Sequence, residues 1–176
     1  MANVRQYNNL VTASEVITQS FTNQATDQAL ISNEIITIAE LAHIKPYLGL
    51  DMYEELKTQN HNSTLTTANS DLVTHYLKPA LCWYVRFEVM NEIQYNTTSA
   101  GLVVNTSDFS SPANVEQFNQ MKNDTFRKAQ VLLDDMIAYI THEDQTNDYP
   151  LYGKDGDYST PNDGDLAKKM NGIIFY

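Results

Sequence analysis

The sequence has little cysteine and little positive charge. Its one cysteine, Cys82, excludes an internal disulfide, and its apolar neighbours predict a small buried side chain rather than a reactive thiol. The chain has 11 lysines and arginines against 22 aspartates and glutamates, a net charge of −11. This balance argues against a protein that grips nucleic acid by its phosphates, because such proteins need a basic surface. It leaves open a protein that lets DNA pass without holding it.

Long hydrophobic runs are also absent. No stretch approaches the roughly 20 apolar residues that span a bilayer. The first ten residues lack the basic-then-apolar plan of a signal peptide, so we expect synthesis in a cytoplasm. The 176 residues, 42% of them hydrophobic, are enough for one domain with a buried core.

Motifs that carry catalysis or hold cofactors are missing as well. There is no glycine-rich phosphate loop, no Gly-x-Ser-x-Gly and no His-Glu-x-x-His. The four histidines share no metal-ligand spacing with each other or with the cysteine: His43, His61, His75 and His142. We expect His43 and His75 to be surface or helix-capping residues.

One acidic stretch resembles the start of a calcium loop, Asp155-Gly-Asp-Tyr-Ser159. Thr160 stands where that loop needs glycine, and Leu166 stands where it needs a bidentate acid. The sequence therefore predicts no catalytic, cofactor or metal site, and we expect the protein not to be an enzyme.

The most apolar stretch, Ser70 to Ile93, predicts a central helix. Its apolar residues recur at spacings of three and four, and from Ala80 to Met90 only two residues are charged. A helix that is apolar nearly all round is normally surrounded by partners. Pro79 lies inside it and removes one backbone donor, so we expect a kink there. The alternative is a break between two shorter helices.

Three further helices flank this one. The first is expected from Thr26 or Asp27 to His43, although Ile35–Ile38 is β-branched and has strand propensity. Pro46 and Gly49 then predict a turn at Ile44–Gly49 and a short helix over 50–56. A polar loop over 59–68 follows, and Thr67, Asn69 or Ser70 caps the central helix.

A long amphipathic helix is expected from Ser111-Pro112 to about Ile140, with its charged residues on a solvated face. Before it, Gly101–Val104 has the composition of a small strand.

The two ends of the chain differ from this middle part. Residues 1–26 are polar, and Val16–Phe21 is expected to be a short strand or an arm docked on a neighbour. Residues 142–176 are acidic and rich in tyrosine, and they close on Ile173–Tyr176. That apolar segment is expected to pack on its own core or to pair as a strand with another chain. We therefore expect an N-terminal arm (1–26), a helical domain (27–141) and an acidic tail (142–176).

Taken together, the patterns predict a mainly α fold. It is a bundle of three to four helices with a kinked central helix, an extended N-terminal arm and an acidic, tyrosine-rich C-terminal tail.

Three segments resemble a known protein family. They are Ile44-Lys-Pro-Tyr-Leu-Gly-Leu-Asp-Met-Tyr-Glu-Glu-Leu56, Tyr76-Leu-Lys-Pro-Ala-Leu-Cys-Trp-Tyr84 and Leu132-Leu-Asp-Asp-Met-Ile-Ala-Tyr-Ile140. In this order they resemble the head–tail connector (adaptor, or neck ring) proteins of tailed bacteriophages, particularly the crAss-like type. The resemblance covers about residues 27–141 and leaves out both ends.

The resemblance implies a structural virion protein at the head–tail junction. Such proteins assemble as a homo-oligomeric ring, usually of twelve subunits, that binds the portal protein, extends the DNA channel and carries tail or other neck proteins. DNA slides through without specific binding, and twelve copies at −11 would carry roughly −130 in all. By analogy, the candidates for partner contact are the residues of two apolar segments: Gly101, Leu102, Val103, Val104, Ile173, Ile174, Phe175 and Tyr176.

Two alternatives come from other classes of protein. One is a monomeric acidic helical domain with an interaction or regulatory role. The other is an enzyme whose pocket collects His75, Glu88 and Glu92 from one stripe of the central helix. We expect that stripe to face solvent or a neighbouring subunit instead.

Overall fold

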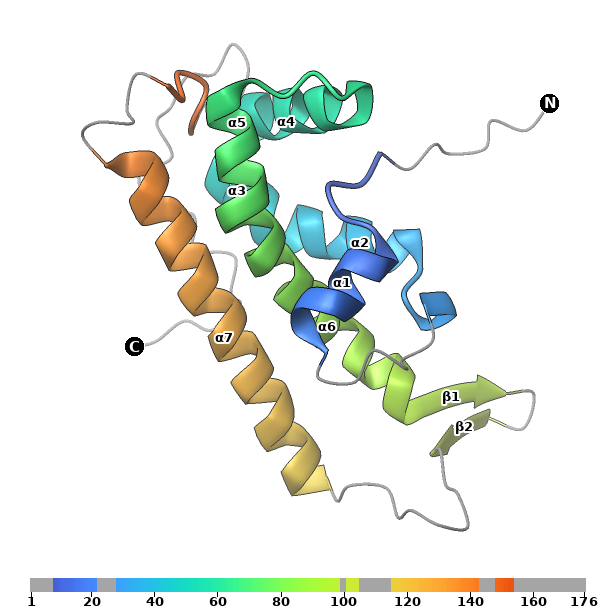
Figure 1. Cartoon of the computed structure of the whole chain (residues 1–176). Coiled ribbons are helices and arrows are strands. Elements are labelled where there is room, and N and C mark those ends of the chain that lie inside the picture. The colour runs from blue at the N-terminus through green and yellow to red at the C-terminus, as the bar shows by residue number, and fades with distance from the viewer. Residues whose placement is uncertain (1–7, 22–27, 99–100, 105–114, 143–147, 154–176) are drawn as a thin grey trace, which may run out of the picture.

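Helices dominate the computed structural model, as the sequence predicts (Figure 1). The structure describes residues 8–21, 28–98, 101–104, 115–142 and 148–153. The helical elements before the strands are α1 (Ala13–Ser20), η1 (Gln28–Leu30), α2 (Asn33–Ala39), η2 (Glu40–Ile44), α3 (Lys45–Leu48), α4 (Leu50–Asn62), α5 (Thr67–Asp71), η3 (Leu72–Leu77) and α6 (Lys78–Gln94). Then follow strands β1 (Tyr95–Thr98) and β2 (Gly101–Val104) and the long helix α7 (Val115–Thr141).

The central helix is continuous through Pro79, as predicted. The disturbance lies one turn earlier, where η3 is a π-helix and the Lys78 N–H donates to the Val73 carbonyl, five residues back. Proline has no N–H and its ring crowds the preceding turn, so a wider turn before it keeps the helix intact. The predicted cap is shifted, because Thr66 rather than a later residue accepts from the Asn69 N–H.

The same π-helical turn occurs before Pro46. There η2 is also a π-helix, and the Lys45 N–H donates to the Glu40 carbonyl. The predicted turn at Lys45 is therefore wrong: Lys45 has helical backbone angles, and α2, η2 and α3 follow one another without a break. Both π-helices end immediately before a Lys-Pro pair. The chain turns instead at Gly49, where a φ of 82° ends α3 as expected.

The N-terminal prediction needs a second correction. Val16–Phe21 is not a strand or a docked arm, because Ala13–Ser20 forms helix α1 and buries Val16 and Ile17 in the chain's own core. Thr12 and Glu15 form a capping box, a Thr-x-x-Glu signal that was visible in the sequence. The first predicted helix also starts later, after the cap Ser32, and α4 runs past residue 56 to Asn62.

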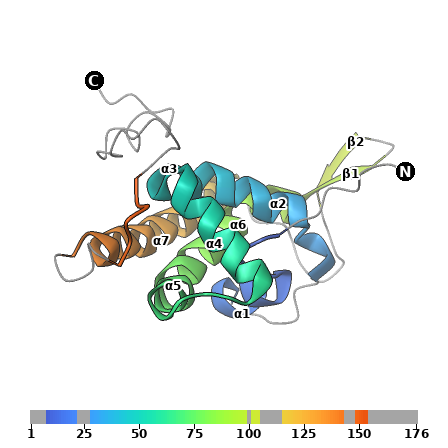
Figure 2. The ribbon, with the colours of Figure 1, turned by 90° about the horizontal axis from the view of Figure 1, so that it is seen from above.

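Helix α6 is the centre of the molecule. Figure 2 shows α1 on one side of it and α2 and α3 on the other, while α7 runs alongside. Of the α6 residues whose burial is described, seven are buried: Ala80, Leu81, Cys82, Tyr84, Val85, Val89 and Met90. Cys82 is fully buried, as predicted, and burial raises the pKa of its thiol to about 12.

Helix α7 covers α6 with one face. Its buried residues recur at helical spacing: Phe118, Thr125, Ala129, Leu133, Met136 and Ile140. Most of its charged residues are exposed, as predicted, and Met121 is also 44% exposed. The helix ends at Thr141, close to the expected Ile140, and its predicted start at Ser111 lies outside the described residues.

The first part of the predicted acidic tail packs on the helices. Tyr149 is 5% exposed and donates its hydroxyl hydrogen to the Ala68 carbonyl, and the Gly153 N–H donates to Leu48. The packed domain therefore extends beyond the expected boundary at residue 141. The predicted partner segment Ile173–Tyr176 and the calcium-like stretch 155–160 lie outside the described residues.

Candidate functional site

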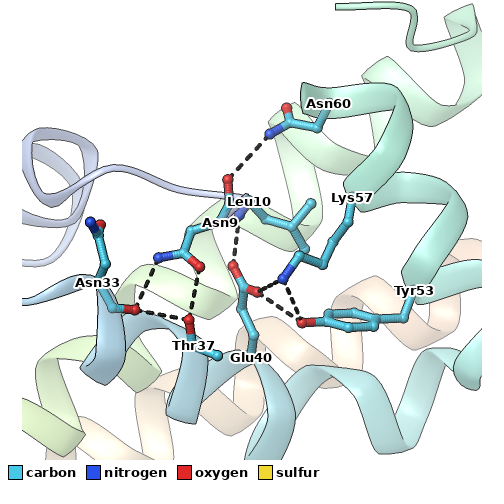
Figure 3. A network of polar contacts seen from close by, with 8 residues as sticks. All are labelled: Asn9, Leu10, Asn33, Thr37, Glu40, Tyr53, Lys57 and Asn60. Carbon is cyan, nitrogen blue, oxygen red and sulfur yellow. Dashed lines mark hydrogen bonds and ion pairs between the residues drawn. The ribbon is translucent and has the colours of Figure 1, made fainter. Parts of the chain in front are cut away.

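The π-helix η2 presents a fully buried carboxylate, that of Glu40 (Figure 3). Its Oε1 accepts from the Leu10 backbone N–H at 2.6 Å. Its Oε2 accepts from the Tyr53 hydroxyl at 2.9 Å and from Lys57 Nζ at 3.2 Å. Lys57 also donates to the Tyr53 oxygen. Buried charges are tolerated when they are paired and hydrogen-bonded, and here both oxygens have donors.

The Glu40 network holds the N-terminal segment on the helical body. The Asn9 amide donates to the Asn33 carbonyl and accepts from the Thr37 hydroxyl, while the Asn60 amide donates to the Asn9 carbonyl. Figure 3 shows these bonds beside those of Glu40. Since the donors come from three separate parts of the chain, the network fixes residues 9–10 between α2 and α4. Its geometry is that of a structural clamp.

The second polar residue of η2, His43, faces α6 and α7. Its Nε2 lies 2.7 Å from Glu88 Oε1, and an ionised carboxylate can only accept, so the histidine nitrogen donates. The imidazole stacks on Tyr84 at 4.2 Å between ring centroids, with 5° between the planes, and its edge meets Phe126. Burial, with the nearby Tyr47 and Asp134, raises the pKa of Tyr84. The expectation that His43 is a surface or cap residue is wrong.

The stripe considered for an enzyme pocket is not brought together. Glu88 faces His43, whereas His75 and Glu92 are exposed. Among the described residues, no group of three or more His, Cys, Asp or Glu side chains could hold a metal ion.

One of the two predicted contact segments is visible in a hairpin. Gly101–Val104 forms β2, antiparallel to β1, with Tyr95 opposite Val104 and Thr98 opposite Gly101. In the described chain these two strands form a sheet by themselves. The hairpin extends from the end of α6, away from the helices (Figure 1). Its outer edges therefore offer backbone groups to a further strand.

An apolar surface on α2 and η2 was not predicted from the sequence. Ile38 is 53% exposed and Leu41 is 40% exposed. Residues three apart are neighbours on a helix, so the two side chains form one small patch. The helical spacing of apolar residues does not by itself say which of several apolar stripes is covered.

Comparison with known proteins identifies the family. No curated protein and no solved structure has a significant match to the chain. Of the described helices, none combines the length and the apolar character needed to cross a bilayer. The model of a family of unknown function, DUF6712, matches residues 44–162, which is more than half of the sequence and runs from the Lys-Pro corner through α7. The chain therefore belongs to the DUF6712 family.

Proposed function

We propose that this protein is a structural, non-catalytic subunit of a tailed-phage neck. In this role it forms a homo-oligomeric ring below the portal protein, extends the DNA channel and joins the head to the tail or to other neck proteins. Its place is the head–tail junction of the virion, after synthesis in the bacterial host's cytoplasm.

The order of elements supports this proposal. The resemblance implies a helix, a Pro-Tyr-Leu-Gly corner, a short helix, a central aromatic helix and a long amphipathic helix. The chain has these as α2 with η2, α3 ending at Gly49, α4, α6 and α7. The buried Glu40 and the partly exposed Glu88 both make contacts between elements, as expected of side chains with a structural role.

The observation that carries the proposal is the β1–β2 hairpin. A two-stranded hairpin is marginal by itself, and its free edges can accept a strand from another chain. It projects beyond the helical wall, where a neighbouring subunit or ring can reach it (Figure 2). The acidic charge of −11 suits a channel through which DNA must slide, because an acidic lumen does not hold phosphates.

The first test is quantitative mass spectrometry of purified virions from the source phage, with the portal protein as the internal standard. The proposal predicts a copy number equal to that of the portal. Absence from the particle would contradict it and would favour the monomeric acidic interaction domain.

The second test addresses the hairpin. Val103→Pro removes a backbone donor from β2, so we expect it to lower incorporation of the protein into particles. The unfolding transition of the isolated variant, followed by the fluorescence of Trp83, serves as the control for folding. Normal incorporation of a folded variant would show that the hairpin is not the contact.

A further inference from the structure

A polar hollow lies between α6 and α7, on the side of α6 that faces α1. It encloses about 280 Å³ and is lined by seven residues: Arg86, Gln117, Gln120, Met121, Asp124, Thr125 and Lys128. Thr125 is buried, whereas the α7 residues at the rim are exposed. The hollow is therefore open to solvent, and side chains that can donate hydrogen bonds surround it.

Arg86 is held in this hollow by aromatic rings. Its guanidinium lies 5.0 Å from the Phe21 ring and 5.2 Å from the Trp83 ring, and Nη1 donates to the Ser20 carbonyl. Partial burial lowers the pKa of Arg86. A guanidinium has five N–H donors in a fixed fork, and the rings and one carbonyl leave several of them available.

No carboxylate among the described residues makes an ion pair with Arg86. Lys128 adds a second cation, with Nζ 4.9 Å from the Trp83 ring. The one acid among the described lining residues is Asp124, and its Oδ1 lies 3.8 Å from Arg127 Nε instead. In a chain with a net charge of −11, this is a local positive site, and its half-buried arginine has no carboxylate partner in the part of the chain that the structure describes.

We propose that this hollow binds carboxylates, and that its occupant is the acidic segment of the same chain, through Asp163 and Asp165. Arg86 offers a carboxylate a planar pair of donors, and Lys128 adds a charge at the rim. Residues 154–165 contain four aspartates and one lysine, so the charges of segment and hollow are complementary. This inference does not depend on the proposed role in the phage neck.

The length of the segment decides which of its aspartates can reach the hollow. The last described residue before this segment is Gly153, and its N–H donates to the carbonyl of Leu48, at the end of α3. Figure 2 shows α3 on the opposite side of α6 from α1. The rings of Tyr149 and Tyr139 lie 6.1 Å apart, which places the start of the segment near that level of α7. From Tyr139 down to Lys128 the helix rises about 17 Å, and the segment must also pass around a helix about 10 Å wide.

An extended chain covers about 3.3–3.6 Å per residue. Asp155 and Asp157 follow Gly153 by two and four residues and so reach about 7 and 14 Å, which is less than the distance from Gly153 to the hollow. Asp163 and Asp165 follow it by ten and twelve residues and reach about 33–43 Å, which is sufficient. The two aspartate pairs therefore provide a matched comparison with equal changes in charge.

Trp83 is the only tryptophan of the chain and lies against both cations, so its fluorescence reports on the hollow. The experiment measures quenching of the full-length protein by acrylamide, a neutral quencher. The double variant D163N/D165N is expected to raise the quenching constant and D155N/D157N to leave it unchanged. High salt is expected to raise the constant of the wild type to that of D163N/D165N, because it screens exposed ion pairs.

Three results would overturn the proposal. Equal effects of the two double variants would mean that net charge, and not the position of the aspartates, changes the quenching. No effect of either would mean that the segment does not dock in the hollow. A quenching constant that falls with protein concentration would place the segment of another copy in the hollow.

A further variant separates docking from the direct contact of Lys128 with Trp83. K128Q is expected to raise quenching, and its combination with D163N/D165N should add nothing more if both act on one contact. Additive effects would contradict the proposal. K122Q makes the same change at another α7 lysine, which lies over the Phe87 ring and does not line the hollow, and serves as the matched control.

Discussion

Two carboxylates of this molecule each face a basic side chain, and they differ chiefly in burial. Glu40 lies in η2 with no exposed side-chain surface, and its partner Lys57 comes from α4. Glu88 lies on α6 with 29% of its side chain exposed, and its partner His43 comes from η2. One π-helix thus contributes to both contacts, in different directions. The comparison teaches that two pairs of similar geometry contribute differently to the free energy of unfolding when solvent reaches the carboxylate of only one of them.

The largest expected effect comes from Glu40→Gln. The neutral amide leaves the Lys57 ammonium without its counter-charge, and it puts an NH₂ group where one carboxylate oxygen accepted hydrogen bonds. We therefore expect a loss of about 3–5 kcal/mol in the free energy of unfolding. Urea unfolding followed by Trp83 fluorescence measures it. A loss below 1 kcal/mol would show that the Glu40 network is not the clamp of the N-terminal segment.

A smaller loss is expected from Tyr53→Phe, which keeps the buried ring and removes only its hydroxyl. The hydrogen bond that Tyr53 donates to Glu40 and the one that it accepts from Lys57 then disappear. A hydrogen bond to a charged group contributes about 1.5–3 kcal/mol, so we expect a loss of at least this size. In the double variant with Glu40→Gln, the two losses should be less than additive, because they share one contact. Full additivity would separate Tyr53 from the network.

Glu88→Gln is the matched control for Glu40→Gln. Since water reaches Glu88, and the amide oxygen can still accept from His43, we expect a loss of about 1 kcal/mol or less. The same urea titration measures it. A loss as large as that of Glu40→Gln would remove the distinction between the two sites.

The smallest effect is expected at a partly exposed pair, Glu15 with Lys78, which joins α1 to α6 at 2.6 Å. Burial raises the pKa of Glu15, but hydrogen bonds from Lys78 and Thr12 outweigh burial and lower it below the ordinary 4.5. An acid with a lowered pKa stabilises the fold above its ordinary value, and this contribution is lost as pH falls through the lowered pKa. Glu15→Gln should flatten the dependence of stability on pH across that acidic range, and an unchanged slope would contradict the assignment.

The sequence was informative where one local rule acts alone. The unbroken apolar stretch predicted α6 and its buried cysteine, and glycine chemistry predicted the turn at Gly49. It was misleading where two rules compete. Proline normally ends the preceding helix, and this rule led us to predict a turn at Pro46. A π-helical turn keeps the helix continuous there, as another one does before Pro79, where continuity was predicted.

The candidate sites show the same division. His43 and Glu88 are 45 residues apart, and nothing in the sequence indicates that they are in contact. The capping box of α1, in contrast, is a local pattern that could have predicted this helix. The small strand Gly101–Val104 was predicted from its composition, but its pairing with β1 and its projection from α6 were not.

By itself, the sequence determined the helical class, the acidic charge and the identity of the central helix, because periodicity and composition are local properties of the chain. The tertiary structure alone decided where Glu40 and His43 point and which face of α2 is left to solvent. It also decided that Arg86 has no carboxylate partner among the described residues. Each of these depends on side chains from distant elements that meet only when the helices pack, and on the water that packing excludes.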